Sequence, residues 1–126
     1  MSKIIHKILL IEDDQLNREL YAEILQDEGY QVEIATDGEE GYLKMKKGGF
    51  DLVLMDIMLP KIDGVNILRK LKEEKKLKGN KKIVLLTNLS EEALLSKGAE
   101  VKSYDYLVKS SVDPGQLISQ VKDFLK

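Results

Sequence analysis

Leu52-Val53-Leu54-Met55-Asp56 is the stretch that decides the fold, because four apolar residues lead directly into a carboxylate. A short, continuous apolar run is typical of a strand buried on both faces of a parallel sheet. Similar runs recur along the chain. They predict five strands, at Lys7–Glu12, Gln31–Ala35, Leu52–Asp56, Lys82–Thr87 and Tyr106–Lys109.

Segments of helical periodicity separate these runs, which indicates an α/β fold with helices on both faces of a parallel sheet. Asp37-Gly38 predicts the start of the second helix, and Asp113-Pro114 the start of the last. A fourth helix is expected from Ser90 to about Val101, although Gly98 inside it costs about 1 kcal/mol relative to alanine. The apolar stripes expected to cover the sheet are Leu16, Leu20 and Ile24, then Val65, Leu68 and Leu71, then Leu117, Val121 and Leu125.

Composition narrows the class of protein. With 126 residues, 43% of them hydrophobic, the chain is long enough for one core, so we expect one domain over residues 1–126 and no output domain. A net charge of -2 provides no general attraction to nucleic acid or anionic membranes. The absence of cysteine excludes disulfides, thiolate metal sites and cysteine nucleophiles. Because no apolar run is long enough for a signal peptide or a membrane span, we expect a cytoplasmic protein without membrane contact.

Polar side chains end four of the predicted strands. Glu12 and Asp13 stand at the end of the first, Asp56 ends the third, Thr87 the fourth and Lys109 the fifth. The carboxyl ends of parallel strands share one edge of a sheet, so we expect these groups to meet there. Two of these negative charges 4 Å apart would repel by about 4 kcal/mol, and a cation must balance them. Mg²⁺ fits, with Asp13 and Asp56 as direct ligands and Glu12 acting through water.

A bound cation gives Asp56 a chemical role. It would let this carboxylate approach an anionic phosphoryl group, which makes Asp56 a candidate nucleophile that forms an acyl phosphate. Lys109 would neutralise one phosphoryl oxygen, and Thr87 would donate a hydrogen bond to another. The residues therefore predict a magnesium-dependent phosphoryl site.

Four motifs containing these residues follow one another along the chain. They are Ile8-Leu9-Leu10-Ile11-Glu12-Asp13-Asp14, Asp56-Ile57-Met58-Leu59-Pro60-Lys61-Ile62-Asp63-Gly64, Leu85-Leu86-Thr87 and Asp105-Tyr106-Leu107-Val108-Lys109. In this order and at these spacings, they resemble the response-regulator receiver family of two-component signalling. The similarity spans nearly the whole chain, and the chain resembles the single-domain regulators of chemotaxis.

The resemblance implies a flavodoxin-like sheet of five parallel strands in the order 2-1-3-4-5. It also implies Mg²⁺ as cofactor, a histidine kinase or phosphotransfer protein as phosphodonor, and an unidentified downstream protein as target. The chain would catalyse only its own phosphorylation and dephosphorylation. The implied roles are phosphoacceptor for Asp56, acidic pair for Glu12 and Asp13, metal ligand for the backbone carbonyl of Met58, switch residues for Thr87 and Tyr106, and phosphate contact for Lys109.

Three features depart from the pattern of the family. Ser110 stands where receivers usually have proline after the lysine, in a bond that is commonly cis, and a cis bond to serine would cost about 2.5–4 kcal/mol. Asn88 stands after Thr87 where a small residue is common, so access of a phosphodonor is expected to change. Gly98-Ala99 comes earlier than the corresponding Gly-Ala of the family, which bears on the length of the fourth helix.

Several of these residues have simpler structural interpretations. Asp14 is expected to cap the first helix, and Asp63-Gly64 to form a turn and start a helix. By itself, Lys109 would be a surface lysine and Tyr106 a half-buried strand residue. His6 precedes the first strand without partners and is given no role as a phosphodonor.

Two other functions have to be weighed against the receiver. One is a phosphorylation-independent interaction module, which the Ser110 and fourth-helix departures favour. The other is an aspartate-nucleophile phosphatase, which would need a second aspartate where Met58 stands. The basic segment Arg69–Lys82 contains no aromatic residue for base stacking, so we interpret it as a solvated helix end and expect no nucleic-acid binding by this chain.

Overall fold

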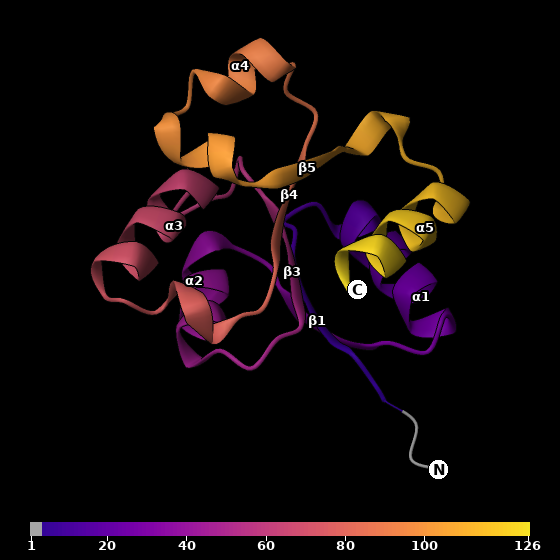
Figure 1. The fold of residues 1–126 in the computed structure, drawn as a ribbon. Helices are drawn as coiled ribbons and strands as arrows, with labels where there is room; N and C mark the ends of the chain where they lie inside the picture. The colour runs from indigo at the N-terminus through magenta and orange to yellow at the C-terminus, as the bar shows by residue number, and fades with distance from the viewer. Residues whose placement is uncertain (1–3) are drawn as a thin grey trace.

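Residues 4–126 of the computed structural model form a parallel sheet with helices on both faces (Figure 1). The strand order is β2-β1-β3-β4-β5, and every neighbouring pair is parallel. This confirms the predicted fold, and each strand ends within one residue of its predicted limits. The strands are β1 (Lys7–Ile11), β2 (Gln31–Ala35), β3 (Leu52–Asp56), β4 (Ile83–Thr87) and β5 (Asp105–Val108).

The helices divide into two layers. One face of the sheet is covered by α1 (Gln15–Asp27) and α5 (Pro114–Phe124), which lie side by side in Figure 1. The other face is covered by α2 (Gly38–Lys47) and α3 (Gly64–Glu73). Shorter elements complete the chain: α4 (Glu91–Leu95) and the 3₁₀ turns η1 (Leu77–Gly79), η2 (Ala99–Ser103) and η3 (Lys109–Ser111). Within residues 4–126, no helix has both the length and the apolar character needed to cross a membrane.

Aspartate side chains begin four of the helices. Asp14, Asp37, Asp63 and Asp113 each accept a hydrogen bond from the backbone N–H three residues further on. Asp113 also forms a reciprocal capping box with Gln116. The predicted helix starts are therefore confirmed, and so are the capping roles expected for Asp14 and Asp63.

The side chains of β3 alternate between the two layers. Leu52 and Leu54 pack in the core beneath α1 and α5, whereas Val53 and Met55 pack beneath α2 and α3. This alternation is inherent in a strand, and it explains why every position of β3 is buried. Asp56 is the last residue of this run, so the sheet delivers its carboxylate to the carboxyl edge.

The predicted stripe of α1 is wrong at two positions. Leu16 is 78% exposed and Leu20 is 50% exposed, whereas Tyr21 and Leu25 face the sheet and are buried. The helix is thus turned by about one residue, or 100°, from the predicted face. The other two stripes lie on the core side as predicted, with Leu125 only partly buried.

The predicted extent of the fourth helix is also wrong. Helix α4 ends at Leu95, and the chain then turns through Gly98 into the separate 3₁₀ segment η2. Gly98 has φ +144°, a value that L side chains rarely adopt and that no helix can continue through. Only Leu94 of α4 is buried, so packing does not extend the helix past the glycine.

Candidate functional site

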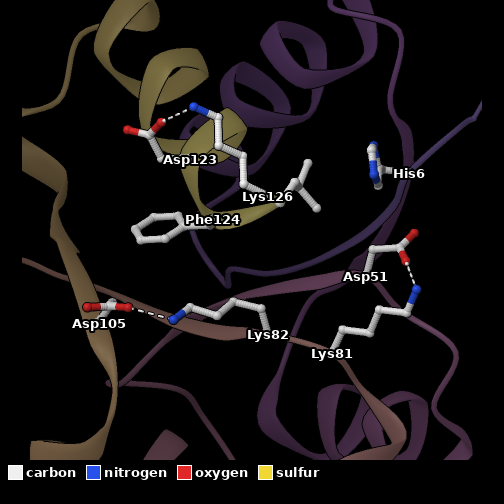
Figure 2. Close-up of a pocket in the computed structure, with 9 residues that line it drawn as sticks. His6, Asp51, Lys81, Lys82, Asp105, Asp123, Phe124 and Lys126 are labelled. Atoms are coloured by element: carbon white, nitrogen blue, oxygen red, sulfur yellow. Dashed lines mark hydrogen bonds and ion pairs between the residues drawn. The ribbon is translucent and has the colours of Figure 1, made fainter.

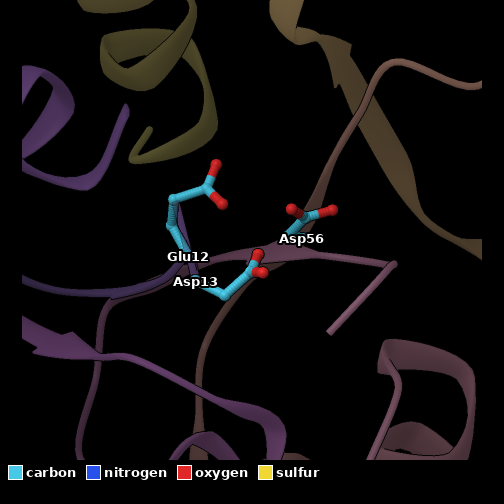
Figure 3. Close-up of side chains that lie close together, drawn as sticks. All are labelled: Glu12, Asp13 and Asp56. Carbon is cyan, nitrogen blue, oxygen red and sulfur yellow. The ribbon is translucent and has the colours of Figure 1, made fainter. Parts of the chain in front are cut away.

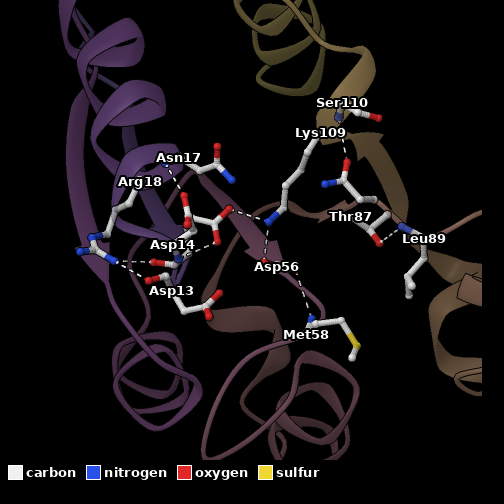
Figure 4. Close-up of polar contacts among 12 residues, drawn as sticks. Asp13, Asp14, Asn17, Arg18, Asp56, Met58, Thr87, Leu89, Lys109 and Ser110 are labelled. Atoms are coloured by element: carbon white, nitrogen blue, oxygen red, sulfur yellow. Dashed lines mark hydrogen bonds and ion pairs between the residues drawn. The ribbon is translucent and has the colours of Figure 1, made fainter.

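Asp56 lies at the carboxyl end of β3 with both carboxylate oxygens engaged (Figure 4). Its Oδ1 accepts a hydrogen bond of 3.2 Å from the backbone N–H of Met58, and its Oδ2 accepts one of 2.6 Å from the ammonium of Lys109. The residue is only 6% exposed. Burial together with two donors fixes this carboxylate at the rim of the sheet.

Lys109 follows β5 directly and reaches across the sheet edge to two acids. Its Nζ lies 2.6 Å from Oδ2 of Asp56 and 2.6 Å from Oε1 of Glu12. Burial by itself lowers the pKa of Lys109, but the bonds to the two carboxylates outweigh it, so this pKa lies above its usual value. No peptide bond of residues 4–126 is cis, so the bond between Lys109 and Ser110 is trans. The lysine side chain contacts both acids with this bond in the trans form.

Glu12 directly follows β1 and is fully buried, and several opposing influences act on the pKa of its carboxyl group. Burial raises the pKa of its carboxyl group, the hydrogen bond from Lys109 lowers it, and the negative charge of Asp56 raises it again. The net direction is upward. A cation at this edge would favour the charged form of the glutamate.

The third acid, Asp13, differs from its neighbours by being exposed. Glu12, Asp13 and Asp56 each offer an oxygen, and these oxygens lie within 4.8 Å of one another (Figure 3). Hard carboxylate oxygens at this spacing are the donors that Mg²⁺ prefers, and the open side at Asp13 leaves room for water ligands. The donor set therefore fits a magnesium ion.

Thr87 lies at the end of β4 and borders the same cavity as Asp56. Its hydroxyl oxygen is buried and accepts a hydrogen bond of 2.9 Å from the backbone N–H of Leu89. Thr87 lines a cavity of about 250 Å³ that also reaches Asp56 and Lys109. Thr87 therefore shares a cavity with the candidate acceptor, but its hydroxyl is bonded within its own loop.

Two of the predicted site residues take a less direct part in this arrangement. Tyr106 lies on β5 and is 37% exposed, outside the residues that line the cavity, so its switch role stays a prediction. Met58 borders the cavity and contacts Asp56 through its backbone N–H. The metal-binding role of its carbonyl also stays a prediction.

Arg18 was missed by the reasoning from sequence. Its guanidinium donates hydrogen bonds of 3.0 and 3.1 Å to the backbone carbonyls of Glu12 and Asp13, and thereby braces the loop that carries the acids. The only sequence signal is its position one helical turn after Asp14. Many surface arginines share such a position, so the signal is weak.

A second, larger cavity lies at the amino edge of the sheet (Figure 2). It measures about 480 Å³ and is lined by charged pairs. The pairs are Lys81 with Asp51, Lys82 with Asp105 and Lys126 with Asp123. Each of these lysines faces one aspartate, so the charges in this cavity balance pair by pair. At the carboxyl edge, three clustered acids face a single lysine.

The fold and the carboxyl-edge site together define a receiver-like α/β protein. The chain belongs to the response regulator receiver domain family, whose sequence model matches residues 8–122. The family assignment made from the four motifs is thus confirmed.

Named relatives and solved structures agree with this assignment. The chain is 34% identical over 124 residues to the chemotaxis protein CheY of Treponema pallidum, covering 96% of this chain and 83% of that protein. It is 33% identical over 120 residues to the transcriptional regulatory protein ResD of Bacillus subtilis, covering 95% of this chain but only 48% of ResD. The chain therefore spans about half the length of that regulator.

Two solved structures illustrate the match in fold. The chemotaxis response regulator CheY4 of Vibrio cholerae superimposes with a TM-score of 0.82 at 28% identity, covering 97% of this chain and 100% of that one. The response regulator TrrA of Thermotoga maritima, solved in complex with Mg²⁺ and BeF, gives a TM-score of 0.78 at 34% identity, covering 96% and 100%.

Proposed function

We propose that this receiver domain accepts a phosphoryl group on Asp56 from a phosphohistidine of a histidine kinase or phosphotransfer protein. The observation that carries the proposal is the placement of the Asp56 carboxylate. It opens onto a cavity, touches the ammonium of Lys109, and lies within reach of the acidic oxygens of Glu12 and Asp13. A nucleophile, a fixed positive charge and a candidate magnesium site thus meet at one point.

The transfer begins with a carboxylate oxygen of Asp56 attacking the phosphorus atom. The new oxygen–phosphorus bond forms as the bond from phosphorus to the histidine nitrogen breaks, and that nitrogen keeps the electron pair and takes up a proton from solvent. Lys109 neutralises one phosphoryl oxygen from its position beside Asp56. When bound at the three acids, Mg²⁺ supplies the positive charge that lets the two anions approach. Water later attacks the phosphorus atom, and the bond from phosphorus to the Asp56 oxygen breaks, which restores the carboxylate and releases inorganic phosphate. We propose no other turnover.

The signal follows from a change of partner at Thr87. Its hydroxyl oxygen accepts a bond from Leu89 N–H, and it would instead donate a hydrogen bond to a phosphoryl oxygen. This moves the loop after β4 toward Asp56 and leaves room for the half-exposed ring of Tyr106 to turn inward. The two arrangements present different surfaces, and a downstream protein binds one of them preferentially.

Intact-protein mass spectrometry after incubation with acetyl phosphate tests the proposal. A single phosphoryl adduct is expected on the wild-type protein in the presence of Mg²⁺, and none is expected with EDTA or in Asp56→Asn. Asp63→Asn is the matched control, because Asp63 caps α3 and is not among the three clustered acids. Its adduct should equal that of the wild type. A folded wild-type protein that forms no adduct would instead indicate the phosphorylation-independent module.

A further inference from the structure

A hydrogen bond joins the two loops that flank the site. Asn88 is the first residue after β4, and its Oδ1 accepts a hydrogen bond of 2.8 Å from the backbone N–H of Ser110, the residue after Lys109 (Figure 4). The two residues are 22 positions apart in the chain. Both loops are exposed, so this bond is a tie across the surface rather than part of the core.

The tie acts next to the groups that carry the chemistry. Asn88 and Lys109 line the same cavity of about 250 Å³ as Asp56. The N–H that Asn88 binds belongs to the peptide immediately after Lys109, so holding this peptide holds the Cα from which the lysine side chain starts. The Lys109 ammonium must reach two carboxylates at 2.6 Å, and such a geometry is sensitive to small shifts at that Cα.

We propose that Asn88 is a positioning residue for Lys109, acting through its side-chain bond to Ser110 N–H. The proposal rests on the proposed phosphoacceptor function. A proline at position 110 would have no N–H to donate, so the tie requires a residue other than proline there, and in this chain that residue is serine. The hydrogen bond between Asn88 and Ser110 thus restrains the backbone after Lys109, as the ring of a proline at position 110 would otherwise do.

The same bond links the lysine to Thr87. Asn88 follows Thr87 directly, and the Thr87 hydroxyl is bonded to Leu89 on the other side of Asn88. A movement of Thr87 toward a phosphoryl group therefore pulls on Asn88 and, through it, on the Lys109 loop. The bond makes the two loops move together.

A double-mutant cycle separates this role from simple crowding at the cavity mouth. Asn88→Leu keeps the approximate size of the side chain and removes the acceptor, whereas Ser110→Ala keeps the N–H and serves as control. Phosphorylation by acetyl phosphate with Mg²⁺ should be about two- to tenfold slower in Asn88→Leu, the range that one net hydrogen bond supplies. It should be unchanged in Ser110→Ala. In a Ser110→Pro background, where the donor is absent, Asn88→Leu should have no further effect.

Hydrogen exchange at the Ser110 amide reports the bond without any phosphoryl transfer. Exchange should be about two- to tenfold faster in Asn88→Leu than in the wild type, with thermal unfolding unchanged. Equal exchange rates in the two proteins would overturn the inference, as would unchanged or faster phosphorylation in Asn88→Leu, or an equal loss in the Ser110→Pro background. If the wild type forms no adduct at all, the proposed function fails, and the amide exchange alone decides whether Asn88 holds the loop.

Discussion

The ammonium of Lys109 lies 2.6 Å from Oδ2 of Asp56, although 53 residues separate the two in the chain. The same ammonium also bonds Glu12, so one fixed positive charge faces two buried carboxylates, with exposed Asp13 close by. The edge of the sheet is therefore left with more negative than positive charge.

Lys109→Met should make folding dependent on magnesium. Without the ammonium, Glu12 and Asp56 stay buried with no counter-charge, so the free energy of unfolding in EDTA should fall by about 3–5 kcal/mol. Mg²⁺ should recover much of this loss. Urea unfolding with EDTA or Mg²⁺ measures both quantities. Lys82→Met is the control, because its pair with Asp105 is exposed and should cost under about 1 kcal/mol in either condition. An equal loss for Lys109→Met with and without Mg²⁺ would contradict the prediction.

Substitutions at the adjacent residues Asp13 and Asp14 should have different effects, one on magnesium binding and the other on the stability of the fold. Asp13→Asn removes a candidate magnesium ligand, and we expect Mg²⁺ affinity to fall at least about tenfold, with stability in EDTA unchanged or higher. Asp14→Ala removes the cap of α1 and should cost about 1 kcal/mol of stability while Mg²⁺ affinity stays near that of the wild type. Calorimetric titration and thermal unfolding of both variants give the comparison. The assignment fails if the two substitutions weaken magnesium binding equally.

Asp51 should contribute to the fall in the free energy of unfolding at acidic pH. Its carboxylate accepts a hydrogen bond from Lys7 N–H at 2.8 Å and faces Lys81, and together these partners hold the pKa of Asp51 below its usual value. Because the folded pKa lies below the unfolded one, the stabilisation is complete above an unfolded pKa of about 3.9 and is lost as pH falls through the folded pKa.

The free energy of unfolding should therefore decrease more steeply below about pH 4 in the wild type than in Asp51→Asn. Urea unfolding between pH 7 and pH 3 measures the two slopes. Asp123→Asn changes an exposed carboxylate and should leave the slope of the wild type unaltered. Parallel curves for the wild type and Asp51→Asn would show that this carboxylate does not carry the effect.

Gly38→Ala should be among the most damaging small substitutions in this chain. A Cβ at Gly38 would overlap the backbone oxygen of Ile62, so the loop after β3 or the start of α2 would have to move. We expect a loss of about 3 kcal/mol or more in the free energy of unfolding. Gly115→Ala is the counterpart within α5, where the added Cβ meets Asp113 Oδ1 at 3.4 Å. Helix propensity should raise stability there by up to about 1 kcal/mol, and a similar loss at both glycines would refute the steric argument.

Much of the sheet and of the site could be predicted, because short runs of apolar residues determine both the strands and the residues at the strand ends. A run such as Leu52–Asp56 can be buried on both faces only as a central strand, and its last residue must then lie at the carboxyl edge. The meeting of Glu12, Asp56 and Lys109 follows from that rule, without knowledge of any side-chain geometry. Aspartate caps were equally predictable, because their hydrogen bonds are local.

The errors occur where tertiary packing decides between similar patterns. In α1, the stripe through Leu16 and Leu20 has the same period as the stripe through Tyr21 and Leu25, and only contact with the sheet shows which one is buried. After α4, the extended, positive-φ conformation of Gly98 prevents the helix from continuing, and the sequence cannot show that the glycine takes this conformation. The bond from Asn88 to Ser110 joins loops distant in sequence, so no local pattern reveals it.

Glu12 and Asp13 follow β1, Asp56 ends β3 and Lys109 follows β5, so these residues are brought together only by a sheet that has formed across most of the chain. A partly folded molecule, with β5 detached, keeps the carboxylates but not the ammonium that partners them. Magnesium that binds the assembled cluster then acts as a folding ligand by mass action. At a hundred times its dissociation constant, it would add about 2.7 kcal/mol to the stability of the whole domain rather than of one loop.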